Sequence, residues 1–254
     1  MTFNVAAESY DRFMGVWAQR LAGPFADFAG VAPGMRVLDV GCGPGALTTE
    51  LVARLSSDAV SAVDPSETFV AAARDRLAGV DVRRAPAESL PYPDASFDAA
   101  LAQLVVHFMT DPAAGIREMS RVVRSGGVVA ACVWDFGGDR GPLGPFWEAV
   151  RELDPTSPGE AHLAGARKGH LVELFGGAAL AQVQEAELTV TRAFAGFDAW
   201  WELFTHSVGP AGAHVASLDP DRRQALLNRC RAMLPDGPFT LHAAAWAARG
   251  VRPG

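Results

Sequence analysis

Short apolar runs alternate with amphipathic stretches along the first half of the chain. An apolar run bounded by Gly, Pro, Asp or Ser predicts a buried strand, and apolar positions that recur every three or four residues predict a helix. The alternation is typical of a doubly wound α/β fold, in which helices cover both faces of a mostly parallel sheet. The expected strands cover residues 36–40, 59–63, 80–85, 97–102 and 127–134, and the expected helices cover residues 45–55, 66–77 and 112–122.

The remainder of the chain predicts additional elements around this sheet. Residues 7–29 follow a helical repeat with a break at Gly23 and Pro24, which predicts two short helices. Residues 135–159 are rich in Gly, Pro and polar residues, so we expect a loop that passes over the functional site. Helices are expected at residues 167–175, 197–205 and 219–234, and strands at residues 183–194 and 239–248.

Length and composition fit a single domain covering residues 1–254. With 254 residues, 49% of them hydrophobic, the chain can bury a full core, and no apolar run is long enough to span a bilayer. The N-terminal segment contains Glu8 and Asp11 and lacks the basic start of a signal peptide, so we expect a cytoplasmic protein without a membrane partner. A net charge of −7 without a Lys or Arg cluster argues against a nucleic-acid partner.

The cysteines and histidines do not predict a metal site. Cys42, Cys132 and Cys230 lie far apart, without a Cys-x-x-Cys pair or a histidine at ligand spacing. His162 and His170 stand in a polar segment at a spacing that is not typical of metal ligands. We therefore expect reduced thiols, no disulfide and no metal.

A glycine-rich turn follows the first predicted strand. Residues 37–45 read Val-Leu-Asp-Val-Gly-Cys-Gly-Pro-Gly, and the helix predicted next begins at this turn. Glycines permit a tight turn and a close approach of the backbone to a ligand. The second predicted strand ends in Asp64, at the position where nucleotide-binding folds hold a ribose through its hydroxyls. The pattern predicts a cofactor site, although Asp64 as a helix N-cap is the alternative.

The turn also fits the relaxed Gly-x-Gly-x-x-Gly/Ala pattern of dinucleotide-binding enzymes, through Gly41, Gly43 and Ala46. Asp39 separates the two interpretations. A carboxylate two residues before the first glycine would repel a pyrophosphate, whereas it would attract a ligand that carries an amine and a sulfonium. An NAD(P)-dependent oxidoreductase is therefore the less favoured alternative.

Four motifs in order resemble those of the class I S-adenosylmethionine-dependent methyltransferases, in their small-molecule branch. They are the turn at residues 37–45, Asp-Pro-Ser-Glu at 64–67, the segment 87–98 and the helix and Gly-Gly turn at 118–127. The resemblance implies a Rossmann-like sheet of seven strands with a reversed C-terminal hairpin. It implies transfer of a methyl group from S-adenosylmethionine to O, N or C of a small organic acceptor, with S-adenosylhomocysteine as product. A non-catalytic binder of the same cofactor remains an alternative.

The resemblance also implies roles for individual residues. The turn would contact the methionine part of the cofactor, Asp39 its ammonium and Asp64 its ribose, while Pro65 and Ser66 would border the adenine. Ala87 would offer its backbone N–H to the adenine, but Pro86 stands where the family commonly has an aspartate, which puts adenine recognition in doubt. The expected cofactor-binding residues are Asp39, Gly41, Cys42, Gly43, Asp64, Pro65, Ser66, Ala87, Glu88 and Gln103.

The acceptor side is less well defined by sequence. His107 follows the fourth predicted strand and is a candidate general base, because an unperturbed imidazole titrates near neutral pH; a packing role is the alternative. Helix-spaced aromatic residues form either a core or an acceptor pocket. The expected acceptor contacts are Tyr10, Met14, Trp17 and Trp200. We expect a helical cap from residues 1–30, 136–165 and 197–236; the acceptor and the oligomeric state stay open.

Overall fold

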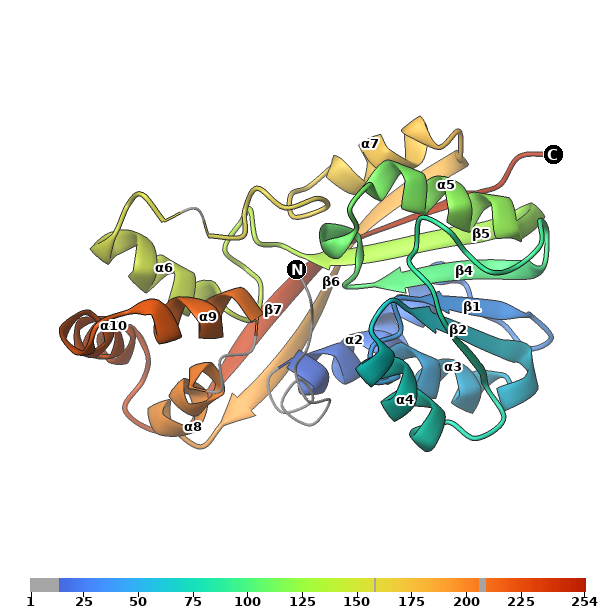
Figure 1. Ribbon diagram of the computed structural model, residues 1–254. Coiled ribbons are helices and arrows are strands. Elements are labelled where there is room, and N and C mark those ends of the chain that lie inside the picture. Colours follow the sequence, from blue (N-terminus) through green and yellow to red (C-terminus); the bar gives the residue numbers. More distant parts are fainter. Residues whose placement is uncertain (1–13, 158, 206–208) are drawn as a thin grey trace.

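The computed structural model describes residues 14–157, 159–205 and 209–254. These residues form a seven-stranded sheet with the order β3-β2-β1-β4-β5-β7-β6 (Figure 1). Strands β1 to β5 pair in parallel, and β7 runs antiparallel between β5 and β6. The doubly wound sheet with its reversed C-terminal hairpin is therefore confirmed. The strands are β1 (Val37–Val40), β2 (Val60–Asp64), β3 (Asp81–Arg84), β4 (Phe97–Gln103), β5 (Val123–Trp134), β6 (Ala181–Phe194) and β7 (Phe239–Val251).

Helices cover both faces of this sheet (Figure 1). On one face lie α2 (Val16–Ala29), α3 (Ala46–Arg54) and α4 (Glu67–Arg76), and on the other lie α5 (Pro112–Val122) and α7 (His170–Gly177). Short 3₁₀ turns, η2 (Ser57–Ala59) and η3 (Val106–Phe108), precede β2 and follow β4. Residues of β1 and β2 are buried without alternation, as expected for strands covered on both faces.

The predicted break at Gly23 and Pro24 is wrong, because α2 is continuous through both residues. Pro24 is exposed, so the backbone donor that it lacks falls on the solvent side of the helix. The opposite side of the helix buries Trp17, Leu21 and Phe25. Burial of this apolar stripe stabilises α2 by more than the missing hydrogen bond costs, since each large apolar side chain contributes about 1.5–3 kcal/mol.

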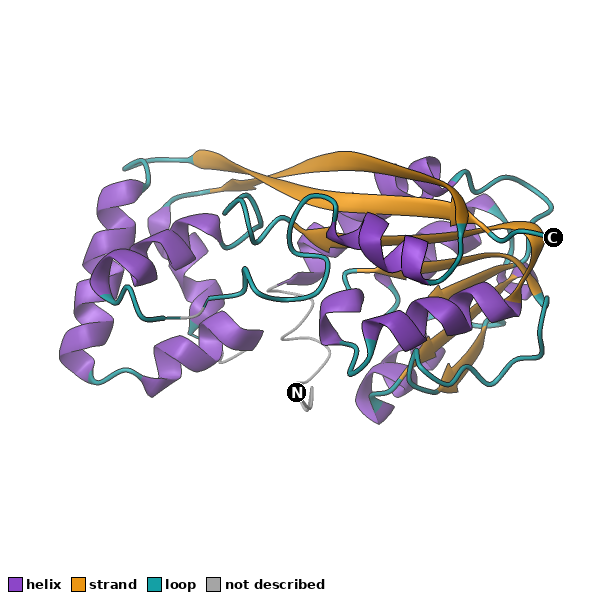
Figure 2. Ribbon diagram, turned by 90° about the horizontal axis from the view of Figure 1, so that it is seen from above, coloured by secondary structure: helices purple, strands orange, loops and turns teal. Residues whose placement is uncertain are grey.

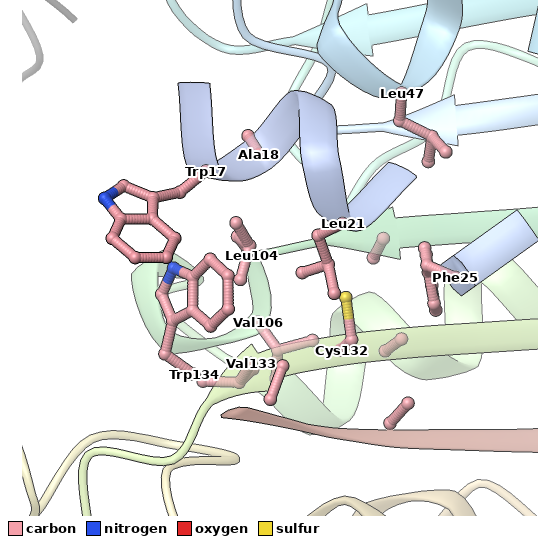
Figure 3. Close-up of a cluster of buried hydrophobic side chains, with 14 of the residues drawn as sticks. Trp17, Ala18, Leu21, Phe25, Leu47, Leu104, Val106, Cys132, Val133 and Trp134 are labelled. Carbon is pink, nitrogen blue, oxygen red and sulfur yellow. The ribbon is translucent and has the colours of Figure 1, made fainter. Parts of the chain in front are cut away.

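Trp17 fixes the start of α2 to the end of β5. Its ring meets that of Trp134 edge to face, with ring centroids 6.4 Å apart, and both side chains are buried. Figure 3 shows the pair beside Leu21, Leu104 and Cys132. The contact places α2 next to the carboxyl ends of β4 and β5.

A helical lobe lies at the far end of the long β6–β7 hairpin (Figures 1 and 2). Helix α6 occupies part of the segment that the sequence predicted as a loop, and α9 was not predicted at all. In the lobe, Phe146 of α6 stacks on Phe204, with centroids 4.5 Å apart. The lobe consists of α6 (Gly144–Leu153), α8 (Phe197–Trp201), η4 (Glu202–Phe204), α9 (Gly209–Ser217) and α10 (Pro220–Met233).

The described residues include neither a membrane-spanning helix nor a cluster of metal ligands. None of the helices in these ranges has the length and apolar character needed to cross a membrane. The same ranges contain no group of three His, Cys, Asp or Glu side chains that could hold a metal ion. Cys42, Cys132 and Cys230 are all buried free thiols.

Candidate functional site

The glycine-rich turn leaves β1 in a conformation that its glycines make accessible. Gly41 has φ 74° and Gly43 has φ 54°, both in the left-handed region. The backbone N–H groups of Gly41 and Cys42 both donate to the carbonyl of Val63, at 2.7 and 2.9 Å. A Cβ on Gly41 would lie 2.5 Å from the Val105 side chain, whereas a Cβ on Gly43 would meet nothing within 4 Å. The turn is thus tied to β2 while one side of it stays uncovered.

A cavity of about 280 Å³ lies against this turn, where the carboxyl ends of β1, β2 and β4 meet. Parallel α/β sheets bind ligands at this edge. The structure brings most of the predicted cofactor residues together here. Those that line the cavity are Asp39, Gly41, Cys42, Gly43, Asp64, Pro65, Ser66 and Gln103.

Asp64 is held by two backbone donors at the end of β2. The N–H of Gly43 donates to Oδ2 at 2.9 Å, and the N–H of Ser66 donates to Oδ1 at 2.8 Å. Burial raises the pKa of Asp64, and these two hydrogen bonds oppose the rise. The N-cap of α4 is Ser66, whose hydroxyl accepts from the N–H of Phe69. Asp64 is therefore not the helix cap, and its carboxylate borders the cavity.

Asp39 is 1% exposed and has only one hydrogen-bond donor among the described residues. The hydroxyl of Thr48 donates to Oδ2 at 2.6 Å, and the buried Oδ1 has no partner there. Burial, with a smaller contribution from the charge of Asp64, raises the pKa of Asp39 to about 7, against the hydrogen bond from Thr48. Leaving a buried acceptor unsatisfied costs about 1–3 kcal/mol. Asp39 consequently offers a strong acceptor to a ligand that brings a donor.

Gln103, the last residue of β4, connects the cavity to α2. Its Nε2 donates to the carbonyl of Ala18 at 3.0 Å, which fixes the orientation of the amide. The amide oxygen Oε1 is buried and has no hydrogen-bond partner in the described ranges. The cavity is thus bordered by two side chains that each keep a buried, unsatisfied oxygen.

Two predicted adenine contacts, Ala87 and Glu88, do not line the cavity. The Oε1 of Glu88 accepts from the backbone N–H groups of Thr110 and Asp111, at 2.7 and 3.2 Å. Glu88 thus fixes the loop that leads into α5, whose N-cap is Asp111. Ala87 is buried in the main core. Pro86 is exposed and is not among the lining residues either.

His107 does not match the expected general base. Its ring lies between Phe108 and Phe136, with centroids 3.9 and 5.6 Å away, and it does not line the cavity. Burial lowers the pKa of His107 to about 3, so the imidazole is neutral at physiological pH and a weak base. The assumption of an unperturbed imidazole is therefore wrong.

The predicted acceptor contacts that fall within the described residues do not line the cavity. Trp17 and Trp200 are each 1% exposed and belong to the core, Trp200 packing against Phe204 at 4.8 Å between centroids. Neither tryptophan lines the cavity, so the core alternative holds for both. Met14 is half-buried against the core, and Tyr10 lies outside the described residues.

Sequence reasoning missed several lining residues at the end of β4. Leu104 has φ 61°, an uncommon backbone conformation for a residue other than glycine, and its N–H donates to the backbone carbonyl of Cys132 at 2.8 Å. Val105 and the partly exposed Phe108 follow it along the cavity. A run of apolar residues carries no sign of a left-handed conformation, although the aromatic residue Phe108, shortly after β4, could have been noted.

A family model described as a methyltransferase domain matches residues 38–131. A chloroplastic 2-methyl-6-phytyl-1,4-hydroquinone methyltransferase of Oryza sativa subsp. japonica is 37% identical over 117 residues, which cover 45% of this chain and 33% of that protein. The chain spans about a third to a half of the length of the first curated relatives that it matches. The similarity in sequence thus centres on the half of the chain that builds the cavity.

Solved structures share the fold over most of the chain. The YcgJ protein of Bacillus subtilis has a TM-score of 0.60 at 20% identity, covering 92% of this chain and 98% of that one. Phosphoethanolamine N-methyltransferase 2 of Haemonchus contortus, in complex with S-adenosyl-L-methionine, has a TM-score of 0.59 at 17% identity, covering 98% of this chain and 57% of that one. Residues 38–131 thus match a methyltransferase domain, and the fold around them is similar to that of a solved methyltransferase.

Proposed function

We propose that the protein transfers the methyl group of S-adenosylmethionine to an O, N or C atom of a small organic acceptor and leaves S-adenosylhomocysteine. The observation that carries this proposal is the pair of unsatisfied buried oxygens, Asp39 Oδ1 and Gln103 Oε1, on side chains that border one cavity. An ammonium supplies hydrogen-bond donors and a positive charge. The residues present therefore fit the aminoacyl end of this cofactor.

The other lining residues fit the remainder of the same molecule. Asp64 keeps acceptor capacity beyond its two backbone hydrogen bonds, because an ionised carboxylate has about four lone-pair sites, and would bind the ribose hydroxyls. Pro65, Ser66 and Phe69 would border the adenine. The cofactor supplies a methyl group that is already activated by a sulfonium. The chain's own contribution is to orient the reacting groups and to exclude water.

The charge of the cavity supports this cofactor over a dinucleotide. Asp39 and Asp64 are both buried, and the charge of Asp64 contributes to the raised pKa of Asp39. A pyrophosphate would add negative charge beside two carboxylates, whereas a cationic ligand offsets their repulsion. The oxidoreductase alternative therefore has no support in the electrostatics of the cavity.

The nature of the acceptor remains a matter for screening. One relative is named for a hydroquinone and one solved neighbour for phosphoethanolamine, so the family does not specify an acceptor. The net charge of −7 favours a small molecule over a nucleic acid as the acceptor. Three buried free thiols favour a reducing compartment such as the cytoplasm.

Isothermal titration with S-adenosylhomocysteine, with NADH in parallel, tests the cofactor assignment. We expect micromolar binding of the first ligand, none of the second, and a strong loss in Asp64→Ala. Asp75→Asn, an exposed acidic position on α4 away from the cavity lining, is the matched control and should bind normally. Binding of NADH alone, or undiminished affinity in Asp64→Ala, would overturn the assignment.

Enzymatic activity needs a separate test, because a non-catalytic binder would pass the titration. The protein is incubated with methyl-labelled S-adenosylmethionine and a panel of phenols, amines and carboxylates, and S-adenosylhomocysteine is measured by mass spectrometry. Acceptor-dependent product, absent in Asp64→Ala, supports methyl transfer. A protein that binds the cofactor but turns over no member of the panel favours the non-catalytic alternative.

A further inference from the structure

A buried carboxylate, Glu160, lies in the segment between α6 and α7, outside the cofactor cavity. Its side chain is 6% exposed, and its Oε2 accepts from Nε1–H of Trp147 at 2.6 Å. Trp147 is itself buried on α6 and packs 5.8 Å from His214 of α9, between ring centroids. Because both partners are enclosed, Glu160 has a fixed position rather than that of a solvated surface acid.

No basic side chain pairs with Glu160 within the described ranges. In these ranges its hydrogen bond comes from the neutral indole N–H of Trp147, and burial raises the pKa of Glu160 to about 7. A buried acid without a cation is costly to a fold, and such groups concentrate at functional sites. Glu160 therefore needs an explanation beyond packing.

Glu160 borders a small hollow of about 10 Å³, close to the volume that one water molecule needs. Asp139 and Arg151 also border the hollow, and they pair with each other at 2.6 Å. Two carboxylates and one guanidinium leave an uncompensated negative charge when Glu160 is ionised. A group with positive charge and the size of a single heavy atom would complete this site.

The loop between β5 and α6 limits what can enter. A Cβ on Gly144 would overlap the carbonyl oxygen of Asp139, and one on Gly141 would lie 3.3 Å from the Phe136 ring. Both glycines border the hollow. The hollow itself, at about 10 Å³, leaves room for a compact head such as an ammonium but not for a guanidinium or a ring.

Aromatic rings in contact link this hollow to the cofactor cavity. Phe136, two residues beyond the carboxyl end of β5, borders the hollow and lies 5.6 Å from the ring of His107. The ring of His107 lies 3.9 Å from that of Phe108, which lines the cofactor cavity. Three consecutive aromatic rings thus connect the two sites.

We propose that this hollow is the anchoring subsite for a protonated amine on the methyl acceptor, with Glu160 as its counter-ion. The proposal rests on the proposed function, because it assumes that an acceptor lies along the rings of Phe108, His107 and Phe136. The ammonium donates to Glu160 and to the loop carbonyls, and its charge offsets the buried carboxylate. The amine is an anchor, so the reacting atom is a different one, at the Phe108 end of the acceptor.

Benzylammonium is a suitable probe, with benzyl alcohol as the neutral analogue of the same shape. Isothermal titration of the full chain saturated with S-adenosylhomocysteine measures both, which keeps the probe away from Asp39. We expect benzylammonium to bind at least about tenfold more tightly than benzyl alcohol, since hydrogen bonds to charged groups are worth more than one power of ten in affinity. Absent binding of benzylammonium, or equal binding of the two probes, overturns the proposal without any variant.

Glu160→Gln removes the charge and keeps an oxygen that accepts from Trp147, so it separates charge from structure. We expect this variant to lose the preference for benzylammonium, while Glu148→Gln, at an exposed position of α6 beside Trp147, keeps it. An unchanged preference in Glu160→Gln overturns the proposal. S-adenosylhomocysteine is also titrated into all three proteins. If it does not bind, the cofactor assignment is contradicted. If it binds normally and the protein does not prefer benzylammonium, only the proposed amine subsite is contradicted.

Discussion

Asp39 is expected to make cofactor binding depend on pH. In the ligand-free protein the pKa of this carboxyl is raised to about 7, first by burial and then by the charge of Asp64. A ligand ammonium stabilises the ionised form and so lowers this pKa in the complex. Binding therefore releases a proton, and affinity falls as the pH falls through 7.

The magnitude follows from the pKa of about 7. At pH 8 about one tenth of the ligand-free protein carries a proton on Asp39, and at pH 6 about nine tenths does. Apparent affinity for S-adenosylhomocysteine should therefore be about tenfold weaker at pH 6 than at pH 8, with about half a proton released per site at pH 7. The same raised pKa means that Asp39 favours the folded, ligand-free state at low pH and that this stability is lost as the pH rises through 7.

Isothermal titration at pH 6, 7 and 8, in buffers with different ionisation enthalpies, measures affinity and proton release together. Asp39→Asn is the control, since its amide oxygen still accepts from Thr48 but does not titrate. We expect weaker binding in this variant at pH 8 and a smaller change between pH 6 and pH 8. Titration of the ligand's own amine affects both proteins equally. The difference in pH dependence between the wild-type protein and Asp39→Asn therefore reports on Asp39 alone. Equal pH dependence in the two proteins would refute the reasoning.

Three further substitutions address the turn, the link to α2 and the lobe. Gly41→Ala combines a φ of 74° with a contact 2.5 Å from Val105, so chemical denaturation should show a loss of about 2–4 kcal/mol; a loss below about 1 kcal/mol would contradict the geometry. Gln103→Leu removes both the bond to Ala18 and the unsatisfied oxygen, and titration should show about tenfold weaker binding of S-adenosylhomocysteine, which unchanged affinity would disprove. Trp200→Ala should cost about 3–5 kcal/mol in denaturation, and a stable variant would restore Trp200 as an acceptor contact.

The parallel half of the sheet was predictable because each element carries its own local signal. The apolar runs are bounded by turn residues, and the structure places β1, β2 and β4 within a residue or so of the predicted ranges. Helix α6 was missed because Gly144 and Pro145 at its start are typical of a loop. What makes this segment a helix is contact with distant residues such as Phe204, about which local sequence carries no information.

Site residues were likewise predictable where local sequence places them at the end of a strand, and not where their position depends on distant contacts. Asp64 and Gln103 are the last residues of β2 and β4, so their predicted strands placed them at the edge where ligands bind. Glu88 does not line the cavity, and its hydrogen-bond partners, the N–H groups of Thr110 and Asp111, lie far along the chain. Glu160 had no sequence signal, since an acid in a polar segment is ordinarily exposed and its burial depends on Trp147.

Asp39 and Asp64 border one cavity but are prepared for different partners. Asp64 receives two backbone N–H bonds, which stabilise its charge and orient its oxygens before any ligand arrives. Such a carboxylate suits a neutral diol, which contributes hydrogen bonds without compensating charge. Asp39 receives one hydroxyl bond and keeps an unsatisfied oxygen, so its ionised form gains most from a cation. The pH dependence of binding should therefore reside in Asp39, while Asp64 contributes affinity through its fixed geometry.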